Sequence, residues 1–190
     1  MLKVKYGIDK NEWLEGWEIY YKTYKQKSVY IRAAVFLIPL ALFVEQVVRD
    51  PSYGVGWVCV GICIACMAAL FFSKHTEKKN YTRALEALKD DEYILTVDGS
   101  TLTLETVLPE SDKEFLEPDE EGNLKEYPAI EPTVCDLSDN SLKCFETENI
   151  IGLFSEKLGC VIPKAKINED ELNELKTSLK SILLERYSER

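Results

Sequence analysis

Histidine is almost absent from this 190-residue chain, in which His75 is the only one. A single histidine cannot build a Ser-His-Asp triad or a histidine-rich metal site. The sequence also lacks a glycine-rich phosphate loop and a Gly-x-Ser-x-Gly motif, the marks of nucleotide-binding sites and serine hydrolases. We therefore expect no enzyme activity and no catalytic, cofactor-binding or metal site, and we expect His75 at an interface.

The six cysteines do not form a ligand pattern. Cys63-x-x-Cys66 has metal-ligand spacing, but it lies in an apolar run with no histidine or carboxylate beside it, so we interpret both as small buried residues. Three further cysteines are expected as buried, reduced residues of strands, because a cytoplasmic compartment keeps thiols reduced. They are Cys135, Cys144 and Cys160.

Charge divides the chain into two unlike parts. Residues 1–83 carry 12 basic and 7 acidic side chains, a net charge of +5, whereas residues 84–190 carry 11 basic and 26 acidic side chains, a net charge of −15. The acidic part excludes nucleic acid as a partner. Its only close basic pair is Lys164 with Lys166, so we expect no specific binding of anionic lipid headgroups by this part.

Two long apolar runs within residues 29–72 predict a transmembrane helical hairpin. Gly54–Phe72 has no charged residue, and its nineteen residues span about 28 Å as a helix, close to the thickness of the hydrocarbon core. Val29–Val48 is nearly as apolar, and Pro39 in its middle is expected to kink the helix without preventing insertion. The recurrence of small residues at Gly61, Ala65 and Ala69 favours close helix packing.

Basic residues flank the hairpin on one side, so both termini are expected in the cytoplasm. The connecting turn holds only Arg49. Glu45 and Gln46, near this turn, are interpreted as interfacial residues rather than as an intramembrane site. We expect no cleaved signal peptide. The flanking basic residues are Lys22, Lys25, Lys27 and Arg32 before the hairpin and Lys74, Lys78, Lys79 and Arg83 after it.

Residues 1–28 predict a cytoplasmic amphipathic helix. A capping box of Asp9 and Glu12 begins a helix over about 10–27. Its aromatic stripe favours either the headgroup level of a bilayer or packing on the cytosolic domain or the following helix, and the sequence does not choose between them. After the hairpin, residues 73–90 predict a linker helix. The stripe consists of Trp13, Trp17, Tyr20, Tyr21 and Tyr24.

From residue 91 to residue 190 the hydrophobic period is two, which predicts strands. Asp98-Gly99 joins a clear hairpin of 93–97 and 101–107. The acidic segment 110–131 fits a second, irregular hairpin or a solvated loop. Asn168 then caps a helix with an apolar stripe. Further strands are predicted over Thr133–Leu137, Leu142–Glu146, Ile150–Phe154 and Cys160–Pro163.

Seven short strands followed by one amphipathic helix predict an α+β fold, in which a pleckstrin-homology-like (PH-like), strongly bent antiparallel sheet is capped by the last helix. Asp98-Gly99, residues 145–154 and Val161-Ile162-Pro163-Lys164, together with the helical hairpin, resemble the YcxB-like family of bacterial integral membrane proteins. The resemblance implies a multi-pass protein of the bacterial inner (cell) membrane with a PH-like cytosolic part. It implies no enzymatic activity.

This layout favours a membrane-anchored interaction or sensing domain. Besides the lipid bilayer, the expected partner is a protein or a second copy of the chain, because an acidic domain suits a basic protein surface. The alternative is an oligomeric component of a transport or channel assembly, for which Glu45 with Gln46 is the candidate polar feature.

Overall fold

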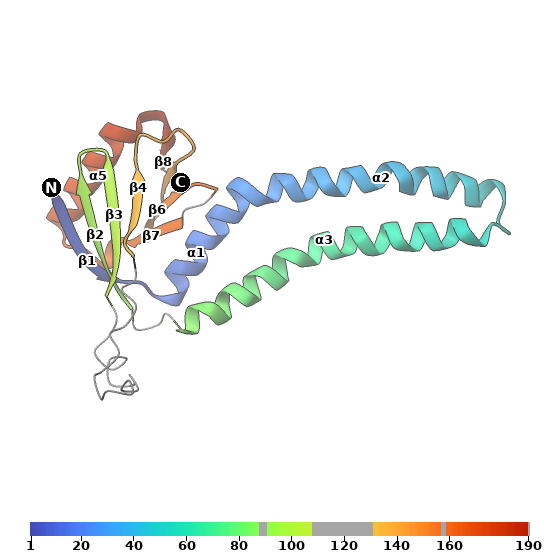
Figure 1. The fold of residues 1–190 in the computed structure, drawn as a ribbon, viewed down its shortest axis with the longest axis horizontal. Helices are drawn as coiled ribbons and strands as arrows, with labels where there is room; N and C mark the ends of the chain where they lie inside the picture. The colour runs from blue at the N-terminus through green and yellow to red at the C-terminus, as the bar shows by residue number, and fades with distance from the viewer. Residues whose placement is uncertain (88–90, 108–130, 157–158, 190) are drawn as a thin grey trace, which may run out of the picture. The chain divides into compact units, whose positions relative to one another are not determined.

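In the computed structural model the chain forms two compact units, an α+β unit and a pair of long helices (Figure 1). The β unit comprises Met1–Ile19 and Leu85–Arg190, and the helical unit comprises Tyr20–Ala84. The β unit is thus made from both ends of the chain, and the helical unit is inserted in its sequence. The structure describes residues 1–87, 91–107, 131–156 and 159–189.

The first sheet of the β unit has four antiparallel strands in the order β1-β2-β3-β4. Gly99, in the two-residue turn between β2 and β3, has a φ of +56°, which glycine adopts without steric cost. Alternate residues face the interior, as in Val4 opposite Leu95 and Leu95 opposite Leu104. The strands are β1 (Leu2–Gly7), β2 (Glu92–Asp98), β3 (Thr101–Val107) and β4 (Thr133–Asp136).

The second sheet has the order β7-β6-β5-β8, and its β5–β8 pair is parallel. Helix α5 (Glu169–Leu183) begins at Asn168, whose side chain accepts a hydrogen bond from the Asp170 amide. Its Leu175, Leu179 and Leu183 are fully buried. The strands are β5 (Lys143–Glu146), β6 (Ile150–Phe154), β7 (Gly159–Pro163) and β8 (Tyr187–Glu189), with short 3₁₀ turns at Lys164–Lys166 and Leu184–Arg186.

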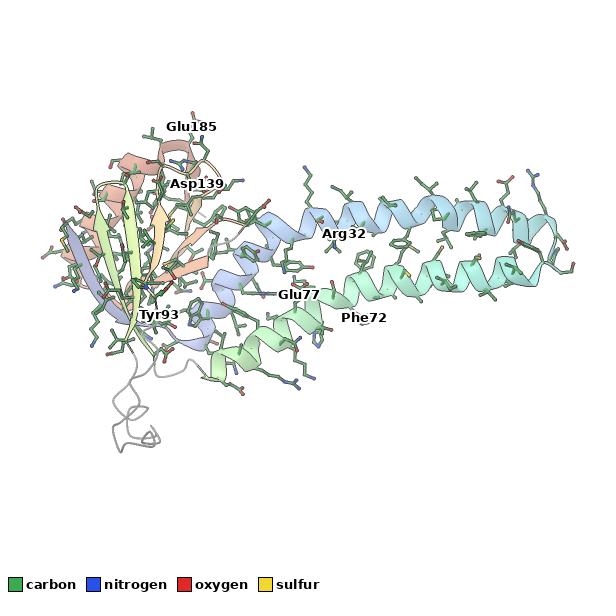
Figure 2. The ribbon with its side chains drawn as sticks, viewed as in Figure 1. Arg32, Phe72, Glu77, Tyr93, Asp139 and Glu185 are labelled. Atoms are coloured by element: carbon green, nitrogen blue, oxygen red, sulfur yellow. The ribbon has the colours of Figure 1, made fainter. Side chains whose placement is uncertain are left out.

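Helix α1 (Lys10–Tyr20) packs on the β unit through its aromatic and small residues. Trp17 is buried, and the Trp13 ring meets the Tyr93 ring edge-on, with centroids 6.1 Å apart; Figure 2 labels Tyr93. Gly16 lets the helix approach β7 so closely that an added Cβ would lie 2.4 Å from the Val161 Cγ2 atom. Of the two alternatives for the stripe, packing on the domain is therefore confirmed for Trp13 and Trp17.

The strands predicted over 93–107, 133–137, 142–146, 150–154 and 160–163 are confirmed, as are the two capping motifs. Three features differ from expectation. The strands form two sheets rather than one bent sheet. In the second sheet, β8 adds a parallel pair with β5. Residues 2–7, expected within an amphipathic helix over 1–28, form β1, and the β unit does not begin at residue 91 but includes Met1–Ile19. The hairpin considered within 110–131 lies outside the described residues apart from Glu131.

The helical unit consists of two long helices joined by a short turn. A π-turn, Tyr21–Lys25, leads into α2 (Gln26–Arg49), and Pro39 lies inside this helix without ending it. Helix α3 (Gly54–Ala87) runs unbroken through the predicted linker helix as far as Ala87. Both helices are long and apolar enough to cross a membrane, and only 11% of the most apolar window of each is buried.

We predict that Gly16→Ala and Val161→Ala are energetically coupled. Each change alone should lower the free energy of unfolding, but the double variant should lose about 1 kcal/mol less than the sum, because removing Cγ2 makes room for the new methyl group. The measurement is urea unfolding of the full chain in detergent, followed by tryptophan fluorescence.

The control pairs Val161→Ala with Gly61→Ala, where an added Cβ meets nothing within 4 Å. That pair should be additive within about 0.5 kcal/mol. Additivity of the Gly16 pair as well would contradict the packing of α1 on β7.

Candidate functional site

The residues singled out from the sequence do not come together in one site. Glu45 forms an exposed ion pair with Arg49 one turn away on α2. His75 is exposed on α3, and Cys63 is buried between apolar neighbours. Among the described residues, no group of three His, Cys, Asp or Glu side chains is placed to hold a metal ion.

The three cysteines of the β unit are buried free thiols, as expected. Burial raises the pKa of Cys160 to about 12 and also raises the pKa of Cys135 and of Cys144. These thiols stay protonated near neutral pH, and a protonated thiol is a poor nucleophile.

A buried carboxylate on β5, Glu146, is the most perturbed acid in the part of the chain that the structure describes. Its Oε1 atom lies 2.9 Å from the Lys164 Nζ and 2.6 Å from the Lys176 Nζ, and the Tyr187 hydroxyl donates a hydrogen bond to Oε2. Burial by itself would raise its pKa, but hydrogen bonds from Lys176, Tyr187 and Lys164 outweigh burial and lower the pKa of Glu146 to about 2. Every partner comes from a different element, so Glu146 ties β5 to the 3₁₀ turn, α5 and β8.

Sequence reasoning did not find this cluster. The available signal was an acid at the end of a strand whose neighbours are apolar, but its partners lie at three distant positions along the chain. We interpret the Glu146 cluster as structural, because all three partners hold the carboxylate in its ionised, hydrogen-bonded form.

A hollow of about 570 Å³ lies on the surface of the β unit, next to Lys164. We refer to it as the α1 groove. It is bordered by the first turns of α1, the β5–β6 turn and the 3₁₀ turn after β7. Its lining residues are Asp9, Asn11, Glu12, Glu15, Glu148, Asn149, Lys164 and Ala165.

Hydrogen bonds hold two of the four carboxylates of the α1 groove, those of Glu12 and Glu15. The Asp9 amide donates to Glu12 Oε2 at 2.7 Å, which is the predicted capping box. Glu15 accepts from the Thr147 hydroxyl at 2.5 Å and from the Asn149 amide at 3.1 Å. The two bonds to Glu15 join α1 to the β5–β6 turn, and they come from neutral donors that do not cancel its charge.

Both lysines of the predicted basic pair are engaged by carboxylates. Lys164 contacts Glu146 and also donates to the Thr147 carbonyl oxygen at 2.7 Å, whereas Lys166 lies 2.8 Å from Asp9 Oδ1 and 3.6 Å from Glu12 Oε2. Lys166 thus pairs with two of the four lining acids and Lys164 with Glu146, so Glu15 and Glu148 keep the α1 groove acidic, and its chemistry suits a cationic group.

Comparison with protein-family models, with curated proteins and with solved structures found no match to this chain.

We predict that Glu146→Gln lowers the free energy of unfolding by about 3 kcal/mol at pH 7, because the folded-state pKa is about 2 against a usual value of 4.5. Because the pKa of Glu146 is lower in the folded state than in the unfolded state, its ionised carboxylate stabilises the fold at pH values above the unfolded-state pKa. This stabilisation is lost as the pH falls toward the folded-state pKa. The difference between variant and wild type should therefore shrink from about pH 5 toward about pH 2.

Urea unfolding of the full chain in detergent at a series of pH values measures this difference. The control is Lys5→Gln, which removes an exposed ion pair with Glu92 and should cost less than about 1 kcal/mol. A loss for Glu146→Gln that does not change with pH would contradict the assignment.

Proposed function

We propose that this chain is a two-span membrane protein whose cytoplasmic β unit recruits a protein partner to the membrane. One observation carries the proposal: two exposed apolar helices are inserted between β1 and β2 of a unit that has its own buried core. Exposed side chains such as Ile38, 67% accessible, and Phe72, 69% accessible, suit lipid rather than water.

Basic residues support a cytoplasmic location for both termini. Four lie before or near the start of the first apolar run and four follow the second, whereas the far end of the hairpin offers Arg49, the last residue of α2, which pairs with Glu45. The asymmetry fits the rule that basic loops stay in the cytoplasm. The resemblance to the YcxB-like family leads to the same proposal, a multi-pass protein of the bacterial inner membrane.

The β unit supports a PH-like assignment through its element order. A four-stranded antiparallel sheet is followed by the β5-β6-β7 meander and then by α5, whose apolar face is buried. The short β8 and the helices between β1 and β2 are additions to that order. We propose this unit as an interaction domain, not as an enzyme.

The α1 groove supports a basic protein segment as the partner. Glu15 is held by two hydrogen bonds, so it needs little rearrangement to meet a lysine or arginine side chain. Both lysines that might attract an anionic headgroup are paired with carboxylates. The acidic charge of the groove mainly raises the rate at which a basic partner associates, and it disfavours acidic partners.

Membrane insertion predicts that the full chain remains in the membrane pellet after alkaline carbonate extraction. Ile38→Asp combined with Ile62→Asp should release most of it, because an acid at the centre of a spanning helix costs about 3 kcal/mol. Ser52→Asp, in the turn between the helices, is the control and should not change retention. Release of the wild type would contradict the proposal.

Partner recruitment predicts that crosslinking in native membranes, followed by mass spectrometry, recovers a stoichiometric protein with the full chain. Asn11→Lys with Glu148→Lys should abolish this recovery, because both residues line the α1 groove and are exposed. The matched control places the same two changes at Asn173 and Glu174, which are exposed on α5. Equal recovery with both double variants, or recovery of the chain alone, would overturn the proposal.

A further inference from the structure

The start of α2 carries a second hollow, of about 440 Å³, at the point where the chain changes from polar to apolar. It belongs wholly to the helical unit. Its lining residues are Lys22, Gln26, Lys27, Tyr30, Ile31 and Ala34. Two lysines therefore lie at one end of the hollow and two apolar side chains at the other.

A π-turn aligns the two lysines. In a regular α-helix, residues five apart point in directions about 140° apart, so Lys22 and Lys27 would not share a face. Here the Gln26 amide donates to the Tyr21 carbonyl oxygen, an i to i+5 hydrogen bond whose wider turn brings residues five apart closer to one face. The π-turn thus places both ammonium groups on the side of the helix that carries Tyr30 and Ala34.

The neighbouring cations are already engaged inside the helical unit. Lys25 forms a 2.8 Å ion pair with Glu77, labelled on α3 in Figure 2, and the hydrogen bond from this pair raises the pKa of Lys25. The Lys74 ammonium lies 5.3 Å from the centre of the Tyr21 ring. Among the described residues, by contrast, no carboxylate lies within ion-pairing distance of Lys22 or Lys27, and both are exposed.

The Tyr30 hydroxyl lies between the two ends of the hollow, where it accepts a 3.2 Å hydrogen bond from the Gln26 side chain and keeps its own proton available to donate. Ile31 is 56% accessible and Ala34 is exposed. Ala34 lies seven residues beyond Lys27, which is about 10 Å along the helix axis. That length reaches from the headgroup level into the hydrocarbon core.

We propose that this hollow binds one anionic phospholipid, with Lys22, Lys27 and the Tyr30 hydroxyl at the phosphate and an acyl chain along Ile31 and Ala34. The proposal rests on the insertion of the hairpin in a membrane. It goes further, because a general attraction between basic residues and an anionic leaflet needs neither aligned lysines nor a shaped hollow.

The test uses the full chain reconstituted in phosphatidylcholine vesicles that contain a minor fraction of phosphatidylglycerol. The protein is extracted in mild detergent, and native mass spectrometry counts the lipids that remain bound. The wild type should retain one phosphatidylglycerol in preference to phosphatidylcholine. Lys22→Gln with Lys27→Gln should reduce this preference about 30-fold, the effect expected for two lysines at the membrane surface.

Two control variants separate a site from diffuse charge. Lys79→Gln with Arg83→Gln removes the same charge from exposed positions on α3 and should leave the preference intact. Exchanging Lys27 and Ser28, as Lys27→Ser with Ser28→Lys, keeps the composition but turns the lysine about 100° around the helix, and it should reduce the preference about 5-fold, the effect expected for one lysine.

Equal losses in the Lys22/Lys27 and Lys79/Arg83 double variants, an exchange variant that binds like the wild type, or a wild type without preference would each overturn the site. Displacement of the lipid by millimolar inorganic phosphate would overturn it as well, because a phosphate alone lacks the acyl contact. Carbonate extraction of the same reconstituted vesicles distinguishes the lipid site from membrane insertion. Wild-type protein that is retained but shows no lipid preference would contradict only the site. Wild-type protein that is released would contradict both proposals.

Discussion

The pairing of β1 with β2 is the constraint on which the rest of the structure depends. The ladder runs from Leu2 opposite Val97 to Gly7 opposite Glu92, and α1 and the helical hairpin lie between these strands in the sequence. Closing so long a connection is entropically costly for a flexible chain. Most of the insertion is helical, so forming the ladder does not require the ordering of a flexible loop of this length.

The same closure positions α1, because the chain leaves β1 directly into the capping box at Asp9. Gly16 then brings the helix against Val161, and Glu15 reaches the β5–β6 turn through Thr147. The carbonyl of Thr147 accepts from Lys164, which also holds Glu146. A continuous set of hydrogen bonds therefore links Glu15, at the rim of the α1 groove, to the buried carboxylate of Glu146. These bonds anchor the rim of the groove to the core.

Local signals account for what the sequence predicts correctly. A two-residue period with Gly99 at the turn identifies β2 and β3, and the leucine stripe after Asn168 identifies α5. β1, in which Lys3 and Lys5 alternate with buried Val4 and Tyr6, was missed. The six residues of this strand directly precede a strong helix signal, so the helix predicted over residues 1–28 includes them. β8, the Glu146 cluster and the α1 groove depend on contacts between distant segments, which no local period encodes.

The charge division of the chain acquires a physical meaning in the proposed membrane arrangement. Residues 1–83, which include the hairpin, carry a net charge of +5, and residues 84–190 carry −15. Lysines at the start of α2 attract an anionic leaflet, whereas an acidic domain is repelled from it over a Debye length of about 8 Å at physiological salt. The two forces act on different parts of one chain and favour an orientation in which the hairpin binds lipid and the acidic surface faces the cytoplasm. For the proposed basic partner, this separation means that the α1 groove and the anionic leaflet act on different parts of the chain.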